Sequence, residues 1–317
     1  MTDNISEMAP QNNDLRRKFR SLVGPFVLRQ TRNMVARRSW TGAQALGARL
    51  GACGRYLSAH RYRMAIANLH EVFGETKSDD EIRAIALESL RSVGRLAAES
   101  LRLPSMSKEE IAETCILEGA EHLRAALEAG HGAVLPTPHL GNWEIAAVNC
   151  INQGMPVVAL SRASRDERIA RAITGVRKEL SFPTIPVENG IRPCLRTLNE
   201  NNILAILPDR RARGQGLTVN FLGRQVCVWH TPVLLAARAG AKLIVTHCPR
   251  MPDGRIRGIC EPPMELQATD DREADLLVNT QRMMTRLEEI ILQYPEQYMW
   301  QYDIFRDSLP LADNDKG

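Results

Sequence analysis

The chain has 317 residues, of which 44% are hydrophobic and 25% are charged, and its formal net charge is +4. This length fits one large α/β domain or a domain with an appendage, and the apolar fraction excludes global disorder. The seven cysteines are odd in number and show no Cys-x-x-Cys spacing, which indicates free thiols in a reducing compartment and excludes a disulfide framework or a zinc site.

Charge is distributed unevenly along the chain. Residues 15–63 contain twelve Lys and Arg and no Asp or Glu, which leaves 29 basic and 37 acidic residues for the rest. Such a segment faces an anionic partner, either nucleic acid or a phospholipid surface. The polar residues 1–14 are expected to form a disordered tail.

No transmembrane helix is predicted. The best apolar run, Leu22 to Leu28, is broken by Gly24-Pro25 and is far shorter than the ~20 residues that a membrane span requires. No small-residue cleavage pattern follows this run, so a signal peptide is not predicted either.

Residues 15–105 are expected to form a helical, basic segment that faces a membrane. Thr41 and Gln44 match a capping box at the start of a helix, and Gly47 and Gly51 on that helix allow the close approach of a neighbour. A basic helix with an apolar stripe is typical of an interfacial element. An ordinary helical lid with solvated arginines would show the same pattern.

Beyond the helix expected over 79–102, short apolar strands alternate with helices. This alternation predicts an α/β fold with a mainly parallel central sheet and helices on both faces, over residues 106–308, followed by a tail at 309–317. The expected elements, in chain order, are helix 119–130, strand 133–137, helix 142–152, strand 157–161, helices 166–180 and 191–200, strands 203–207 and 217–222, a helix from Thr231, strands 242–247 and 256–260, and helix 271–293.

The sharpest local feature is the turn Pro138–Glu144, which reads PHLGNWE. It follows an apolar strand and opens a helix, so it lies at the carboxyl end of a strand, where open α/β sheets bind ligands. Gly141 and Asn142 supply the tight turn. If the turn folds back, Glu144 reaches one imidazole nitrogen of His139 and leaves the other to accept a proton, as in a general base. A structural histidine beside a helix-capping glutamate is the alternative.

Other catalytic motifs are missing from the sequence. There is no Gly-x-Ser-x-Gly, His-Glu-x-x-His, Walker-type loop or Gly-x-Gly-x-x-Gly after a strand. A base without a nucleophilic Ser or Cys suits direct transfer from an activated donor, such as a thioester, to a bound hydroxyl. His247 and Cys248 are adjacent, but neighbours on a strand point to opposite faces, which argues against a thiol dyad.

The His-x-x-x-x-(Asp/Glu) spacing of His139 and Glu144 resembles the signature of the lysophospholipid-acyltransferase superfamily. More narrowly, the chain resembles the lipid A late acyltransferase family, including the related phosphatidylinositol mannoside acyltransferases. The resemblance covers roughly residues 60–306. Its further motifs, in family order, are Asn68-Leu69, Phe73-Gly74, Ser161-Arg162, Arg177, Leu207-Pro208-Asp209-Arg210, Phe221-Leu222-Gly223-Arg224, Thr231-Pro232 and Pro295–Trp300.

The resemblance implies that His139 is the catalytic base and Glu144 its orienting partner. Guanidinium groups in the groove are suited to hold a phosphate or to polarise a thioester carbonyl. No metal and no cofactor are expected, since the acyl thioester is a co-substrate. The substrate-binding residues implied are Asn142, Arg162, Arg177, Asp209, Arg210, Phe221 and Gly223.

The expected function is therefore transfer of a fatty acyl group from acyl carrier protein or acyl-CoA to a hydroxyl of a glycolipid, such as a lipid A precursor of lipopolysaccharide. Many relatives carry an N-terminal transmembrane helix, whereas this chain has only the basic segment, which implies peripheral attachment to the cytoplasmic face of the bacterial inner membrane. Asp303 departs from the basic residues usual near the C-terminus and weighs against a phosphorylated lipid A acceptor.

Two alternatives stay open: an acyltransferase for a different phospho- or amino-lipid acceptor, and a non-catalytic lipid-binding relative. Nucleic acid is not an expected partner, because the chain outside the basic segment is net negative and contains no aromatic–basic RNA motif.

Overall fold

A computed structural model describes residues 30–162, 167–212, 214, 216–306 and 308–310. Its centre is a five-stranded parallel sheet with the strand order β4-β3-β5-β2-β8. The tail expected at 1–14 and most of the tail expected at 309–317 lie outside the described residues. The strands of this sheet are β2 (Ala133–Pro136), β3 (Val157–Ser161), β4 (Thr184–Pro186), β5 (Ile203–Ile206) and β8 (Lys242–Leu243).

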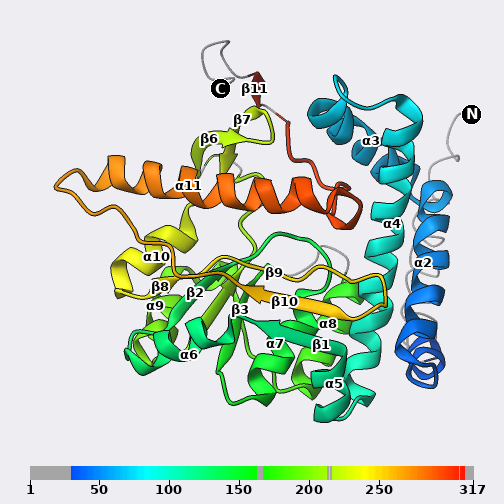
Figure 1. Cartoon of the computed structure of the whole chain (residues 1–317), viewed down its shortest axis with the longest axis horizontal. Coiled ribbons are helices and arrows are strands. Elements are labelled where there is room, and N and C mark those ends of the chain that lie inside the picture. Colours follow the sequence, from blue (N-terminus) through cyan, green and yellow to red (C-terminus); the bar gives the residue numbers. More distant parts are fainter. Residues whose placement is uncertain (1–29, 163–166, 213, 215, 307, 311–317) are drawn as a thin grey trace, which may run out of the picture.

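Helices cover both faces of the central sheet, as predicted (Figure 1). Alternate residues of one strand enter different cores: Val134 packs with α9 (Ile191–Asn199) and α10 (Thr231–Ala239), whereas Leu135 packs with α6 (Ala120–Glu128) and α7 (Trp143–Asn152). Burial on both faces explains why these strands read as continuous apolar runs.

Two smaller sheets flank the central one. The first has the order β1-β10-β9 and the second β11-β7-β6. Helix α11 (Arg272–Gln293) packs along the hairpin of the second sheet (Figure 1). The strands are β1 (Cys115–Glu118), β6 (Leu217–Phe221), β7 (Arg224–Val228), β9 (Thr246–His247), β10 (Ile256–Cys260) and β11 (Leu309–Pro310).

The single strand expected over 242–247 is wrong, because this stretch changes partners halfway. The backbone N–H of Ile244 donates to Val134 of the central sheet, whereas the carbonyl of Val245 accepts from Glu261, beyond β10. The stretch is therefore divided between β8 and β9. Strands β1, β4 and β7 and the helix α5 (Lys108–Thr114) were not predicted, and neither was β11, which lies within the stretch expected as a tail.

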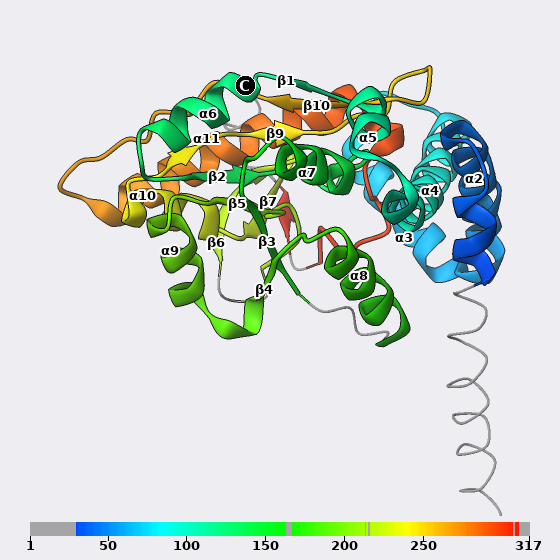
Figure 2. The ribbon, with the colours of Figure 1, turned by 90° about the horizontal axis from the view of Figure 1, so that it is seen from below.

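The chain before the sheets is helical, with α2 (Trp40–Leu57), α3 (Ala59–Phe73) and α4 (Asp79–Arg102) standing side by side at one end of the molecule (Figures 1 and 2). The cap of α2 is Ser39, whose hydroxyl accepts from the Gly42 N–H at 3.1 Å, and not Thr41 as expected. No helix among the described residues has the length and apolar character needed to cross a bilayer. The division of the chain into domains at residue 105 stays a prediction.

Glycines set the crossing of α2 and α4. A Cβ atom on Gly47 would lie 2.4 Å from the carbonyl oxygen of Gly94, and one on Gly51 would lie 2.3 Å from that of Leu90. The helices therefore touch backbone to backbone, which confirms the close approach predicted from Gly47 and Gly51.

One buried carboxylate ties these helices to the rest of the molecule. Glu99 of α4 accepts two hydrogen bonds from Arg250, at 2.6 and 2.7 Å, and one from Gln44 of α2 at 2.7 Å. Its fourth donor is Asn142, at 2.8 Å, in the turn that precedes α7. Four segments distant in sequence thus meet at a single side chain.

We expect Gly51→Ala to destabilise the protein, because the added methyl has no space against the α4 backbone; overpacking of this kind costs roughly 1–3 kcal/mol. Gly54→Ala is the matched control on the same helix, since its Cβ would lie 3.5 Å from the Leu90 side chain, an ordinary contact. The control should hold or gain stability, because alanine favours helix by about 1 kcal/mol over glycine. Thermal unfolding of both variants decides the matter, and equal melting temperatures would contradict the backbone contact.

Candidate active site

The turn after β2 is shaped by a backbone contact. Gly141 has φ +65°, and a Cβ atom there would lie 1.8 Å from the carbonyl oxygen of Cys248. The N–H of Asn142 donates to that same oxygen at 2.9 Å. The Asn142 side chain then caps α7 by accepting from the N–H groups of Glu144 and Ile145, at 3.0 and 3.2 Å. The predicted roles of Gly141 and Asn142 in this turn are confirmed.

Parallel strand register brings His139 and Asp209 together. Pro136 of β2 lies opposite Ile206 of β5, and His139 and Asp209 each follow their strand by the same interval, after Thr137-Pro138 and Leu207-Pro208. Nδ1 of His139 lies 2.6 Å from Oδ1 of Asp209, and the His139 backbone N–H donates to Oδ2 at 2.8 Å. Sequence reasoning placed Asp209 in the groove but missed this pairing; the matching x-Pro-x ends of two neighbouring strands were the available signal.

Burial and mutual attraction set the protonation states of His139 and Asp209. Burial lowers the pKa of His139 below its usual value, because imidazolium is disfavoured away from water, while the Asp209 carboxylate acts in the opposite direction. Burial acts to raise the pKa of Asp209, but the His139 ring and N–H outweigh it and hold that pKa low. The ionised Asp209 accepts a hydrogen bond from the Nδ1–H group of His139, so that Nε2 is unprotonated and carries a lone pair.

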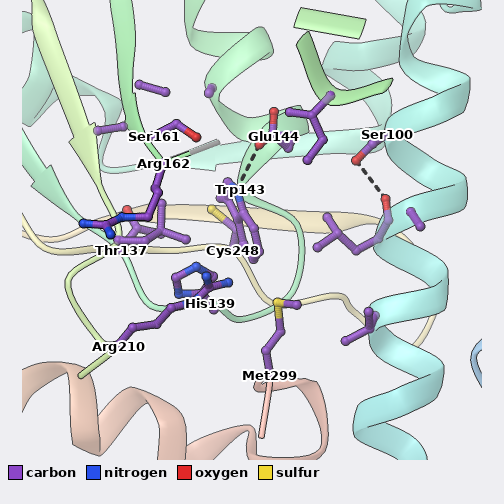
Figure 3. Close-up of a pocket in the computed structure, with 18 of the residues that line it drawn as sticks. Ser100, Thr137, His139, Trp143, Glu144, Ser161, Arg162, Arg210, Cys248 and Met299 are labelled. Atoms are coloured by element: carbon purple, nitrogen blue, oxygen red, sulfur yellow. Dashed lines mark hydrogen bonds between the residues drawn. The ribbon is translucent and has the colours of Figure 1, made fainter. Parts of the chain in front are cut away.

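Aromatic rings enclose the His139 imidazole. Trp143 contacts it edge-on with ring centroids 5.4 Å apart, and Tyr302 lies on another side at 5.6 Å. The guanidinium of Arg210 stacks on the Tyr302 ring at 3.3 Å from its centroid. Figure 3 shows Arg210 beside His139 and Trp143 above it, on the side of Glu144. The ring orientation is thus set by packing as well as by Asp209.

The expected contact between Glu144 and His139 is wrong in this structure. Glu144 instead forms a bidentate pair with Arg177 of α8 (Glu167–Glu179), with Nε–Oε2 at 3.0 Å and Nη2–Oε1 at 2.5 Å. The indole of Trp143 also donates to Glu144 at 3.1 Å. The physical reason is that a carboxylate on the first turn of α7 faces α8, while the imidazole nitrogen is already taken by Asp209.

A large cavity of about 2600 Å³ opens onto His139. Typical small-molecule pockets measure about 300–1,000 Å³, so the space exceeds what one small ligand fills. Its lining is mainly apolar but also contains basic side chains, among them Arg61, Arg162, Arg171, Arg177, Arg210 and Arg211.

The other predicted site residues divide into two groups. Arg162, Arg177 and Arg210 line the cavity, with Arg162 over the ring of Trp229 at 5.9 Å from its centroid. The second group is structural. The Asp209 carboxylate faces His139 and is fully buried, so it is not open to substrate; Asn142 is buried between α7 and Glu99; Phe221 and Gly223 belong to the β6–β7 hairpin, outside the cavity lining.

Cysteines line part of the cavity but are poor nucleophiles. Burial raises the pKa of the Cys248 thiol well above its usual value and that of Cys150 to about 12. Nucleophilic cysteines are thiolates with lowered pKa values, so these thiols stay protonated. Among the described residues, His, Cys, Asp and Glu side chains form no cluster suited to a metal ion.

Comparison with known proteins gives a consistent result. The model of the bacterial lipid A biosynthesis acyltransferase family matches residues 37–307. A phosphatidylinositol mannoside acyltransferase of Mycolicibacterium smegmatis is 32% identical over 238 residues, 73% of this chain and 75% of the relative. One of Mycobacterium tuberculosis is 31% identical over 216 residues, 66% of each. A lipid A biosynthesis palmitoleoyltransferase of Escherichia coli is 23% identical over 264 residues, 82% of this chain and 84% of the relative. The chain belongs to the bacterial lipid A biosynthesis acyltransferase family, and it is an acyltransferase.

Proposed function

We propose that the enzyme transfers a fatty acyl group from an acyl thioester to a hydroxyl of a glycolipid, with His139 as general base and Asp209 as its orienting residue. The observation that carries the proposal is the buried His139–Asp209 pair at the wall of an apolar cavity. A carboxylate on Nδ1 selects the tautomer whose Nε2 accepts a proton. An apolar cavity at that nitrogen suits a long hydrocarbon chain.

The reaction follows from this arrangement. Nε2 removes the proton of the acceptor hydroxyl as its oxygen attacks the thioester carbonyl carbon, which forms the new C–O bond and a tetrahedral oxyanion. Arg210, which lies beside His139, is the cation that we assign to stabilise that oxyanion. Collapse of the oxyanion breaks the C–S bond, and the leaving thiolate takes the proton back from the imidazolium. Because burial keeps the thiols of Cys150 and Cys248 in the cavity protonated, no acyl-enzyme is proposed.

Glu144 does not contact the base and acts indirectly in this scheme. It holds Arg177 of α8 and accepts from the indole of Trp143, whose ring packs against His139. Loss of its charge would therefore disturb the ring wall of the site and the position of α8, and leave the His139–Asp209 hydrogen bond in place. We assign Glu144 a positioning role.

The acceptor that we favour is a mannosylated phosphoinositide or a similar sugar-bearing phospholipid. The support is the higher identity to the mycobacterial relative, 32% against 23% for the lipid A enzyme of E. coli. A lipid A precursor is the second candidate, favoured by the family model. Asp303 lines the cavity and lies 3.8 Å from Arg211 and 3.3 Å from Arg306, so part of the positive charge there is neutralised, which weighs against a heavily phosphorylated acceptor. The donor is acyl carrier protein or acyl-CoA.

We further propose peripheral attachment to the cytoplasmic face of the inner membrane. On α2 the residues Leu50, Tyr56 and Leu57 are 56%, 73% and 83% exposed. Exposed arginines lie on α2 (Arg49 and Arg55) and at the start of α3 (Arg61 and Arg63). Exposed apolar and basic side chains on two neighbouring helices suit the headgroup layer of an anionic bilayer.

Removing the base should abolish transfer. We expect His139→Ala to lower kcat/KM by about 10²–10⁴-fold, the contribution of a positioned general base. Asp209→Asn should cost nearly as much, because an amide no longer selects the productive tautomer, whereas Glu144→Gln should cost less. His131→Ala, at an exposed histidine, is the control. Steady-state assays with acyl-CoA and a phosphatidylinositol mannoside measure these values, and wild-type turnover in His139→Ala would refute the base.

The pH profile should report the buried histidine. The base must be neutral, so kcat/KM rises with pH through the pKa of His139 and is level above it. Because burial lowers that pKa, the acid limb should lie below 6.5, the ordinary histidine value. Asp209→Asn removes a charge that raises the pKa, so the residual activity of this variant should have its limb at still lower pH. A limb at or above 6.5, or one that Asp209→Asn leaves unmoved, would contradict the assignment.

Membrane binding should depend on charge and salt. We expect the protein to bind vesicles containing phosphatidylglycerol and to dissociate as salt rises, since screening shortens the reach of charge from ~30 Å at 0.01 M to ~10 Å at 0.1 M. The double variant Arg55→Glu/Arg61→Glu should bind more weakly, and Arg272→Glu, exposed at the start of α11, serves as the control. Vesicle flotation that is indifferent to lipid charge and salt would reject this attachment.

A further inference from the structure

Arg210 carries a positive charge beside the base, and none of the carboxylates among the described residues forms an ion pair with it. The adjacent Asp209 is bound to His139 instead, at 2.6 Å. Asp303 pairs with two other arginines, at 3.8 and 3.3 Å. Because Arg210 also lines the cavity, its terminal N–H groups are available to a substrate and are not occupied by an acceptor of the protein.

The ring of Tyr302 holds this guanidinium in place. The central carbon Cζ of Arg210 lies 3.3 Å from the centroid of the Tyr302 ring. The Nε atom of Arg210 is buried and has no hydrogen-bond partner within the described part of the chain, so packing fixes this side chain. A planar guanidinium stacks on an aromatic face, whereas an ammonium group is a compact point charge on a flexible stem. Stacking thus positions the cation and leaves its terminal N–H groups free, which a bidentate carboxylate would occupy.

Tyr302 also contacts the base. The centroids of the Tyr302 and His139 rings lie 5.6 Å apart, with an interplanar angle of 59°. The segment that carries Tyr302 is anchored at two points. Asn68 of α3 donates to the carbonyl groups of Tyr302 and Trp300, at 2.6 and 2.8 Å, and the N–H of Met299 donates to the His139 carbonyl at 3.0 Å. One anchored ring therefore touches both the base and the cation beside it.

We propose that Tyr302 is a positioning residue for acyl transfer: its ring holds the Arg210 guanidinium where the oxyanion forms, at a fixed spacing from His139. This role rests on the function proposed above and on the oxyanion contact assigned there to Arg210. The oxyanion exists only during transfer, so a misplaced donor weakens the transition state and not the bound substrate. Loss of the ring should therefore lower kcat and leave KM little changed.

Two substitutions separate the ring of Tyr302 from its hydroxyl. Tyr302→Phe keeps the stacking surface and should transfer at close to the wild-type rate. Tyr302→Leu removes the ring and should lower kcat by about tenfold to 10²-fold, the loss that a ~1 Å misplacement near a reaction centre can cause. Tyr294→Leu is the matched control and should keep the wild-type kcat. Tyr294 is half-buried against the same core as Tyr302 but lies outside the cavity lining. Melting temperatures show the packing loss that the two leucine variants share.

Two variants at Arg210 test the cation without removing the ring. Arg210→Lys keeps the charge but loses the flat guanidinium, so it should lower kcat by a factor similar to that of Tyr302→Leu. Arg210→Ala should lower kcat by about 10²–10³-fold, as for a lost oxyanion-hole donor. In the double variant Arg210→Ala/Tyr302→Leu the two losses should not add, because Tyr302 acts through Arg210.

A spectroscopic measurement follows the stack without requiring turnover. In protein labelled with ¹⁵N-arginine, the ring current of Tyr302 should shift the side-chain N–H proton signal of Arg210 upfield. Arg210→Lys identifies this signal by its loss. Tyr302→Phe should keep the upfield shift, and Tyr302→Leu should remove it.

The outcomes separate the positioning role from the proposed function. An Arg210 signal that is unmoved in Tyr302→Leu would overturn the stack. Wild-type kcat in Tyr302→Leu or Arg210→Lys, or additive losses in the double variant, would overturn the positioning role, while an inactive His139→Ala would leave the proposed function standing. If the wild type transfers no acyl group to any lipid, the proposed function fails and the positioning role fails with it, although the upfield shift remains.

Discussion

The position of the active-site turn depends on the hydrogen bonds of the buried Glu99 carboxylate. A fully buried charge is tolerated only with close partners, and removing one partner of a buried ion pair costs about 3–5 kcal/mol. Glu99 obtains its partners from Arg250, Gln44 and Asn142. Because Asn142 also caps α7, the helical segment and the turn that carries His139 cannot move independently. The helices α2 and α4 therefore form part of the wall of the site.

The three middle strands of the central sheet, β3, β5 and β2, were predicted from the sequence because they are short, apolar and bounded by polar turns. Strand β3 begins and ends at the predicted residues 157 and 161. The errors arise where the boundaries of an element depend on hydrogen-bond partners that are distant in sequence. Residues 242–247 read as one strand around the apolar run 243–245, and only the positions of Val134 and Glu261 divide them between two sheets. Similarly, Ser39 rather than Thr41 caps α2, because the choice between neighbouring hydroxyls depends on the path of the preceding chain.

In the candidate site too, some features were predicted from the sequence and others depend on contacts between distant segments. His139 was placed at the carboxyl end of a strand because parallel topology brings those ends to one edge of the sheet. The family resemblance placed Arg162 and Arg210 in the groove, and both line the cavity. The hydrogen-bond partner of His139 was predicted wrongly. Proximity in sequence favoured Glu144, whereas proximity in space is set by the register of β2 against β5. The sequence motif therefore locates the proposed base and the helix that follows it, and the residue that we propose to orient the base follows the neighbouring strand β5.

In the proposed mechanism, burial of the base and binding of a hydrocarbon chain have one physical origin. The apolar surroundings that suit an acyl chain also remove water from the His139 ring, which lowers its pKa and favours the neutral form that can accept a proton. Left alone, a desolvated imidazole would be a weak base, and the Asp209 carboxylate counters this by stabilising the charged form that develops during transfer. The same low-dielectric surroundings strengthen the interaction of Arg210 with a developing oxyanion. In the proposed mechanism, the apolar lining that suits lipid chains thus also sets the basicity of His139.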